Sequence, residues 1–302
     1  MKIAVAASPE VAIPTLEYLL ASEHELSLII SRPDSQVGRG RELTPTAVST
    51  WAAANGIELY CPNKAADFDE RLKNFDLVIT IGYGVLLPDY ILVQPKHGFI
   101  NLHFSLLPKL RGAAPAQRAI IDGLTETGIT IFQLDAGMDT GPIYRQKEIA
   151  MPHQATTESL LQDLSVVGAP VVLDAISAIE SNEVPIIQSV DGSSRAEKLS
   201  KDEGRIDWQD PSLRIERKVR AFYPTPGAWT TFRDEPIKIE SANAGEAKAG
   251  LPGEIFLEGK DLFISTSEGS LQILRVKPAG KASMDALSWI NGARIEQHER
   301  FI

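Results

Sequence analysis

Cysteine is almost absent from this chain, since Cys61 is the only one among 302 residues. One cysteine excludes a disulfide within the chain and any metal site built from several cysteines, and no other cluster of typical metal ligands stands out. We therefore predict a protein without a metal. A chain without internal disulfides also fits a reducing compartment, so we expect it in the cytoplasm.

Long apolar runs are missing too, although 43% of the residues are hydrophobic and 23% are charged, as in ordinary globular proteins. No run reaches the roughly 18 apolar residues that a membrane-spanning helix needs. The first seven residues form a strand-like run that turns polar at Ser8, which is too short for a secretory signal. We expect no membrane partner and one or two globular domains.

Positive charge is in deficit, with 30 Lys and Arg against 40 Asp and Glu and a net charge of −10. Residues 1–204 carry the whole deficit, with 16 basic and 26 acidic residues, whereas residues 205–302 carry 14 of each. This balance disfavours non-specific binding to nucleic acid, and we expect no DNA partner. It leaves room for a local basic stripe in the second part, with a modest and salt-dependent affinity for RNA.

Strand-like and helix-like segments alternate in the first half, which is typical of a doubly wound, mostly parallel, Rossmann-like α/β sheet. Glycine is missing from its first strand-to-helix turn, residues 6–10, where a nicotinamide or flavin site would need Gly-x-Gly-x-x-Gly. We therefore expect this topology without a dinucleotide cofactor. The predicted strands are 2–7, 26–31, 57–60, 77–81, 98–102, 127–134 and 143–150, and the predicted helices are 11–21, 45–55 and 157–179.

Glycine and proline divide the second half into short segments. After a predicted helix at 212–222, strands are predicted at 229–232, 237–242, 253–257, 262–266 and 271–276, with a loop at 241–250. Five short strands at this spacing predict a small antiparallel β-barrel of the oligonucleotide-binding (OB) type, which either binds nucleic acid or is a structural appendage. We place the first domain at 1–190, a polar linker at 191–207 and the barrel at 208–302.

Asn101 and His103 lie two residues apart at the end of an apolar run, directly before Ser-Leu-Leu-Pro at 105–108. On a strand their side chains point to the same face. An amide and an imidazole together can donate to a developing oxyanion and move a proton. Asp139 follows on a loop bracketed by glycines, and a carboxylate there can orient the imidazole. No protein nucleophile is needed if the substrate supplies the attacking group.

Two further loops each have two interpretations. Residues 81–88, Ile-Gly-Tyr-Gly-Val-Leu-Leu-Pro, form either a tight turn or a loop whose backbone and apolar side chains hold a flat heterocycle. Residues 32–41, which include Arg39 and Arg41, form either a solvated connection or a contact for phosphate groups.

The pattern Asn-x-His-x-Ser-Leu-Leu-Pro at 101–108, Arg-Gly-Ala-Ala-Pro-x-Gln-Arg at 111–118 and Asp-Thr-Gly at 139–141 resembles the folate-dependent formyltransferases. The similarity runs nearly end to end and includes residues 198–208, 220–224 and 277–281. Within the family, the chain is most similar to the members that act on methionyl initiator tRNA.

The resemblance implies transfer of a formyl group from 10-formyltetrahydrofolate to the α-amino group of methionine on initiator tRNA, for translation initiation. It assigns catalysis to Asn101, His103 and Asp139 in a formyltransferase domain, and tRNA binding to the barrel. Contacts to the folate are implied for Ser105, Leu106, Leu107, Pro108, Tyr83, Val85 and Leu86, and contacts to tRNA for Arg39, Arg41, Lys201, Arg205, Lys277 and Lys281. We expect a monomer.

Three alternatives stay open. A formyltransferase for a small-molecule amine would share the Asn, His and Asp residues but lack the long basic loop and the barrel. A 10-formyltetrahydrofolate hydrolase would use water as the nucleophile. A non-catalytic RNA-binding protein on an enzyme scaffold would bind no folate.

Overall fold

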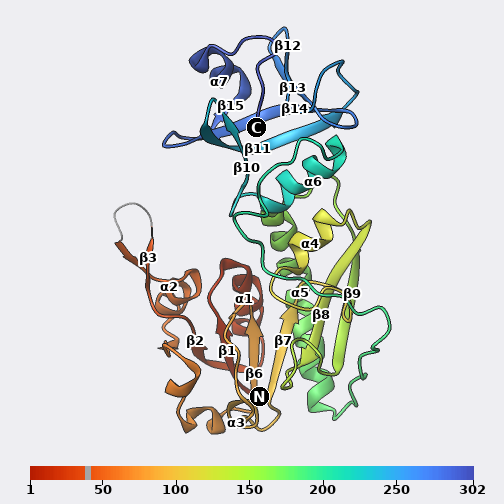
Figure 1. Ribbon diagram of the computed structural model, residues 1–302. Coiled ribbons are helices and arrows are strands. Elements are labelled where there is room, and N and C mark those ends of the chain that lie inside the picture. The colour runs from red at the N-terminus through yellow and green to blue at the C-terminus, as the bar shows by residue number, and fades with distance from the viewer. Residues whose placement is uncertain (38–41) are drawn as a thin grey trace. The chain divides into compact units, whose positions relative to one another are not determined.

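The computed structural model describes residues 1–37 and 42–302 of the chain (Figure 1). It contains two compact units. The first comprises residues 1–115, 126–150 and 161–197, and the second comprises residues 116–125, 151–160 and 198–302. The second unit therefore takes over at Lys198, inside the predicted linker at 191–207, and it also includes two short segments from the first half.

A seven-stranded sheet forms the centre of the first unit, in the order β5-β2-β1-β6-β7-β8-β9 (Figure 1). Neighbouring strands from β5 to β7 pair in parallel, and β8 alone runs antiparallel to both of its neighbours. The predicted mostly parallel sheet is thus confirmed. Its strands are β1 (Lys2–Ala7), β2 (Glu25–Ile30), β5 (Glu58–Tyr60), β6 (Leu77–Ile81), β7 (Phe99–His103), β8 (Glu126–Gln133) and β9 (Ile143–Ala150).

Both faces of this sheet are covered, because every residue of β6 and all but the first of β1 are buried. Such continuous apolar runs are typical of parallel strands between two layers of helices. Helix α5 provides part of the cover, since a Cβ on its Gly168 would lie 3.0 Å from a methyl group of Leu102 on β7. The helices that lie mainly in this unit are α1 (Ile13–Leu20), α2 (Ala47–Ala54), α3 (Asp89–Leu92) and α5 (Thr157–Glu180).

By length and composition alone, α5 could also cross a membrane. No 18-residue apolar run was expected, but α5 passes such a test because its few charges are widely spaced. Its buried side chains include Leu164, Val172 and Ile176, which have no exposed surface. Side chains buried in this way are typical of a helix in the core of a globular domain. The α5 sequence alone does not distinguish such a helix from a membrane-spanning one.

One strand pair of the first half is missing from the sequence prediction. Strand β3 (Ser35–Val37), inside the segment 32–41 predicted as a basic loop, pairs antiparallel with β4 (Glu42–Thr44), which follows that segment. Arg39 and Arg41 lie between them, outside the described residues.

The second unit is a small antiparallel barrel with strand order β10-β11-β14-β13-β12. Residues 299–302 pair with both edges of this sheet: Ile302 exchanges hydrogen bonds with Thr231 of β10, and the Phe301 backbone N–H donates to Gly253, next to β12. This double pairing closes the barrel. Its elements are α4 (Pro115–Ile121), α6 (Ser212–Phe222), β10 (Ala228–Phe232), β11 (Glu235–Gly245), β12 (Ile255–Glu258), β13 (Asp261–Ser265), β14 (Ser270–Pro278), β15 (Met284–Asp285) and α7 (Ala286–Ala293).

The five strands predicted in this unit are all present, but two details were wrong. The segment 241–250 is not all loop, because β11 continues to Gly245 opposite Ser270 of β14 after register shifts between Ile239 and Ala242. Helix α7 was not predicted, although Asp285 accepts a hydrogen bond from the Ser288 backbone N–H as an N-cap.

Candidate active site

The order of the sheet determines where a site can form. From β1 the chain adds β2 and β5 on one side, and then β6 and β7 on the other side. Such a reversal of strand order leaves a crevice at the carboxyl ends of the strands on either side of it. The loop at residues 82–87 follows β6, and the Ser-Leu-Leu-Pro segment follows β7, so both predicted folate segments start at this edge.

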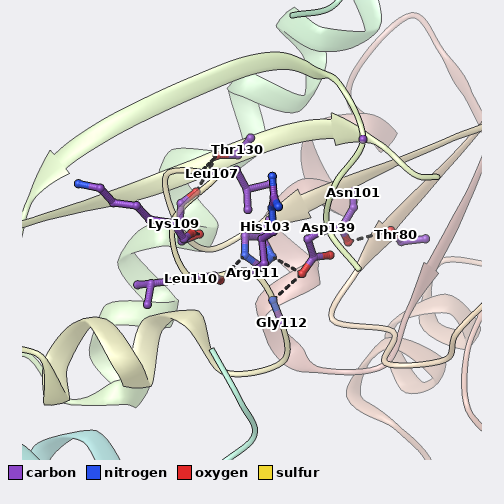
Figure 2. A network of polar contacts seen from close by, with 12 residues as sticks. Thr80, Asn101, His103, Leu107, Lys109, Leu110, Arg111, Gly112, Thr130 and Asp139 are labelled. Carbon is purple, nitrogen blue, oxygen red and sulfur yellow. Dashed lines mark hydrogen bonds and ion pairs between the residues drawn. The ribbon is translucent and has the colours of Figure 1, made fainter. Parts of the chain in front are cut away.

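Asn101 lies on β7 between β6 and β8, where it pairs with Thr80 and Phe132. The Thr80 hydroxyl lies 2.8 Å from the Asn101 Oδ1 and donates a hydrogen bond to it (Figure 2). Within the described part of the chain, the Asn101 Nδ2 has no protein partner. An amide with its oxygen occupied and its two N–H groups free can donate hydrogen bonds to a bound ligand.

His103 is buried at the end of β7, and its Nε2 lies 3.0 Å from the carbonyl oxygen of Leu110. A carbonyl only accepts, so the proton is on Nε2 and the neutral ring has a free lone pair on Nδ1. Burial lowers the pKa of His103, while the Asp139 carboxylate and the Leu110 carbonyl act in the opposite direction. The neutral ring with Nδ1 as a proton acceptor is the resulting state.

The carboxylate of Asp139 faces this free nitrogen, with its Oδ2 3.8 Å from the His103 Nδ1 (Figure 2). Its Oδ2 also accepts a 2.7 Å hydrogen bond from the Gly112 backbone N–H. Gly112 has a φ of +124°, and a Cβ there would lie 2.7 Å from the Ala196 carbonyl oxygen, so only glycine fits. The structure therefore brings the Asp139 carboxylate to His103, which shares a face of β7 with Asn101, although Asn101 and Asp139 are 38 positions apart in the sequence.

Gln188, which the sequence did not single out, holds the Asp139 loop together with Arg111. Gln188 is buried, and its Nε2 donates to the carbonyl oxygens of Asp139 and Gly141 at 3.0 and 2.7 Å. Its Oε1 accepts two hydrogen bonds from the Arg111 guanidinium. Asp135, the other acidic residue of this loop and the alternative candidate for the carboxylate, accepts from the Gly137 N–H and the Thr140 hydroxyl. Asp135 is thus engaged within the loop, whereas the Asp139 carboxylate faces the imidazole.

The predicted folate segment at 105–108 is held by its own hydrogen bonds. The Ser105 hydroxyl donates to the Lys109 carbonyl, and the Leu107 N–H donates to the Thr130 hydroxyl. Ser105 and Leu107 are buried, so any contribution they make to ligand binding is through the shape of the loop. Leu106, Leu107 and Pro108 line a pocket of about 460 Å³, which among the described residues is not lined by Asn101, His103 or Asp139.

The second predicted folate segment offers both polar backbone and apolar side chains. Gly82 and Gly84 have positive φ, and the Gly84 carbonyl accepts a hydrogen bond from the Arg32 guanidinium. Leu86 is 77% exposed, whereas Tyr83 is buried in the core with Val85 packed against it, and burial raises the Tyr83 pKa to about 12. Leu86 and the backbone of this loop are therefore the groups open to a heterocycle.

The four predicted tRNA contacts in the described part are all exposed, and three of them lie near one another. Register places Arg205, Trp229, Lys238 and Lys277 in one row across the barrel, because each is the direct partner of the next. The Arg205 guanidinium lies 5.9 Å from the centre of the Trp229 ring, whose Nε1 donates to the Lys201 carbonyl. We call Arg205, Trp229, Lys238 and Lys277 the basic row. Lys281 follows β14, outside the row.

Across residues 1–37 and 42–302, no group of three or more His, Cys, Asp or Glu side chains is placed to hold a metal ion. The expectation of a metal-free site stays a prediction.

Fold and site together define an α/β group-transfer enzyme with an attached OB-like barrel. The sequence model of the formyl transferase family matches residues 1–176, and that of the formyl transferase C-terminal domain matches residues 198–294. This chain belongs to the formyl transferase family.

Known proteins match this chain over all or most of its length. The methionyl-tRNA formyltransferase of Thermobifida fusca is 41% identical over 100% of this chain and 99% of its own. The structure of an N-formyltransferase from Helicobacter canadensis, with folinic acid and dTDP-3-aminofucose, covers 90% of this chain and 98% of its own, with a TM-score of 0.69 and 19% identity.

HypX from Aquifex aeolicus in complex with tetrahydrofolic acid shares the fold, with a TM-score of 0.67 and 19% identity. The match covers 96% of this chain but only 47% of the HypX chain. At these identities the two solved structures support the fold alone.

Proposed function

We propose that this chain transfers the formyl group of 10-formyltetrahydrofolate to the α-amino group of methionyl initiator tRNA. The observation that carries the proposal is the meeting of a free amide donor, a neutral buried imidazole and a carboxylate at Asn101, His103 and Asp139. Identity of 41% over the full length to a protein named methionyl-tRNA formyltransferase supports the choice of acceptor.

The three residues would have two tasks: one stabilises the developing negative charge, and the other two handle the proton. When bound, 10-formyltetrahydrofolate supplies an activated formyl group. The Asn101 Nδ2 would donate to the formyl oxygen as negative charge develops there. An α-amino group has a pKa near 7.7–8.0, so a useful fraction is neutral and reactive at neutral pH.

The pair of His103 and Asp139 would take up the proton that the amine releases. With its proton fixed on Nε2, the ring presents a lone pair on Nδ1 towards the Asp139 carboxylate. A single proton placed between these two groups is stabilised by the negative charge and can then pass to the departing folate nitrogen. Asp139 would thus orient the His103 ring and favour its protonated form.

The loop at residues 82–87 fits the heterocycle of a folate. It offers backbone polar groups and the exposed Leu86 side chain next to the crevice, which is the combination that flat heterocycles need. The segment 105–108 would shape the opposite wall.

Asn101→Ala tests the catalytic assignment. Loss of one oxyanion donor lowers the rate by about 10²–10³-fold, and we expect a fall in kcat of that order that raised folate concentration does not restore. The measurement is steady-state formylation of charged initiator tRNA. A wild-type kcat in this variant would contradict the role of Asn101.

For tRNA binding, we propose the basic row together with Lys201, Lys281 and the segment of Arg39 and Arg41. Guanidinium and ammonium groups suit phosphate oxygens, and a base can stack on a half-buried indole such as Trp229 beside an arginine. Arg205 also lines a pocket of about 630 Å³ together with Arg300, which brings a second guanidinium to the same side of the barrel.

Formyl transfer to charged initiator tRNA, with uncharged initiator and charged elongator tRNA as controls, tests the function itself. Formate release without any amine would indicate a hydrolase, and preferred transfer to a small amine such as glycinamide ribonucleotide would indicate a different formyltransferase. Failure to bind folate would favour an RNA-binding protein without activity. A monomeric state and a cytoplasmic location are part of the same proposal.

A further inference from the structure

Thr80 is an unusual residue for its position. It is the only polar residue of β6, whose sequence is Leu-Val-Ile-Thr-Ile, and it is 5% exposed in the middle of a fully buried strand. A valine would fill nearly the same volume with no hydroxyl to satisfy. The hydroxyl therefore needs a physical reason.

The geometry supplies one. Thr80 and Asn101 are direct partners on the neighbouring strands β6 and β7, and the Thr80 Oγ1 lies 2.8 Å from the Asn101 Oδ1 (Figure 2). The same hydroxyl lies 3.2 Å from the Ile100 carbonyl, the longer of the two contacts. Since an amide oxygen only accepts, the Thr80 hydroxyl donates to it.

This contact favours one end of the amide facing the ligand, because in the turned orientation the Thr80 hydroxyl would accept from the amide nitrogen and donate only over the longer 3.2 Å contact to Ile100. An Asn side chain can turn by 180° at little steric cost, and the two orientations present opposite hydrogen-bonding groups. With Oδ1 bonded to Thr80, the Nδ2 points away from β6 with both protons available. The turned amide would present an oxygen to a developing oxyanion and repel it.

We propose that Thr80 is a positioning residue that holds the Asn101 amide with its nitrogen towards the formyl oxygen. The inference rests on the proposed function, since it assigns a second residue to the same step. Both side chains stand on strands at the centre of the sheet, so the orientation is set before any ligand binds.

Thr80→Val and Thr80→Ser test the proposal. Valine removes the hydroxyl with little change in volume, and we expect kcat to fall about three- to tenfold while both KM values change less than twofold, since net hydrogen bonds of this kind are worth about 0.5–1.5 kcal/mol. Serine keeps the hydroxyl and should retain most of the kcat. The matched control is Thr15→Val, because Thr15 is fully buried and its hydroxyl has no partner among the described residues.

A double-mutant cycle separates positioning from general stability. In the Asn101→Ala background, Thr80→Val should cause no further loss of kcat, because the amide that it orients is gone. An equal loss in both backgrounds, or a wild-type kcat for Thr80→Val, would overturn the proposal.

A second readout does not depend on turnover. The side-chain amide protons of Asn101 should give one sharp pair of NMR signals in the unliganded wild type and in Thr15→Val. In Thr80→Val they should shift and broaden as the amide samples both orientations, and an unchanged pair would reject the proposal. A wild-type chain that transfers no formyl group would instead reject the proposed function, which keeps the two failures distinct.

Discussion

His103 shows how burial decides the chemistry of a single residue. Its Nε2 donates to the Leu110 carbonyl, and burial is the largest influence on its pKa, which falls below the ordinary value of 6.5. The Asp139 carboxylate opposes this fall but does not reverse it. The ring is therefore neutral near pH 7, with its lone pair towards Asp139.

NMR titration can test this state directly, because the chain has only five histidines. We expect His103 to show the Nε2–H tautomer and to titrate below pH 6.5. Asp139→Asn removes the charge that raises the His103 pKa, so the midpoint should move to a still lower pH. A midpoint at or above 6.5 in the wild type would contradict the assignment.

The same shift affects stability. As the pH falls below 6.5, an unfolded chain binds a proton on this histidine that the folded chain does not. The free energy of unfolding should therefore decrease from pH 6.5 down to the lowered folded-state pKa. Urea unfolding at several pH values measures the difference in the free energy of unfolding between the wild type and His103→Gln. This difference should become smaller as the pH falls through that window.

At the scale of elements, the site depends on a loop that is held by residues far away in the sequence. Asp139 has a φ of +54°, which is strained for a residue other than glycine, and its loop keeps this form through Gln188, 49 residues further along the chain. Gln188 is held in turn by Arg111, on the segment that follows β7. Strand, loop and connecting segment thus share one hydrogen-bond network.

Gln188→Ala should loosen the Asp139 loop. A misplacement of about 1 Å in a catalytic group costs on the order of 10²-fold in rate, and we expect kcat to fall by about ten- to a hundredfold. Val190→Ala, two residues away and 83% exposed, is the control and should keep the wild-type kcat. Steady-state kinetics measures kcat, and a thermal unfolding scan shows whether each variant is folded. Equal kcat values for the two variants would contradict the role of Gln188 in holding the Asp139 loop.

Barrel closure by residues 299–302 has its own test. Phe301 is buried and stacks on Trp208 and Trp289, with ring centres 5.5 and 5.7 Å away. Phe301→Ala should lower the free energy of unfolding of the barrel by about 3–5 kcal/mol. Three of the four tryptophans lie in the second unit, so tryptophan fluorescence in denaturant follows it. Ile302→Ala, 63% exposed, should change little, and equal effects would contradict the closure.

For the whole molecule, the negative net charge disfavours non-specific binding to nucleic acid, so binding would depend on local clusters of basic residues. The net charge of −10 repels a polyanion at long range, so any tRNA affinity must come from cations that touch phosphates directly. The basic row brings together Arg205 and Lys277, which are 72 positions apart, through the pairing of β10, β11 and β14.

Salt dependence measures these contacts. Arg205→Ala and Lys277→Ala should each weaken tRNA binding and reduce the slope of log K against log salt concentration by about 0.7–0.9, one phosphate contact each. Lys260→Ala, an exposed lysine between β12 and β13, serves as the control with an unchanged slope. Unchanged slopes for both row variants would remove the row from the tRNA site.

The amino-acid sequence alone determined most of the elements and pointed to the candidate catalytic residues. Apolar periodicity and the breaks at Gly and Pro are local properties, so the seven strands of the first unit, the five of the barrel and the Asn101–His103 pair could be predicted. Helix α7 and the β3–β4 pair were missed, and β3 and β4 have three residues each, too few to show a period. The reversed direction of β8 is a matter of pairing and leaves no mark in its own composition.

Only the tertiary structure decided how the candidate catalytic residues are held. Thr80, Leu110, Gly112 and Gln188 act through hydrogen bonds to residues at least seven positions away, and closure by residues 299–302 joins segments that are far apart in the sequence. Burial, which sets the protonation of His103, depends on every element packed around it. Contacts of this kind depend on the folded path of the chain, and no local pattern contains them.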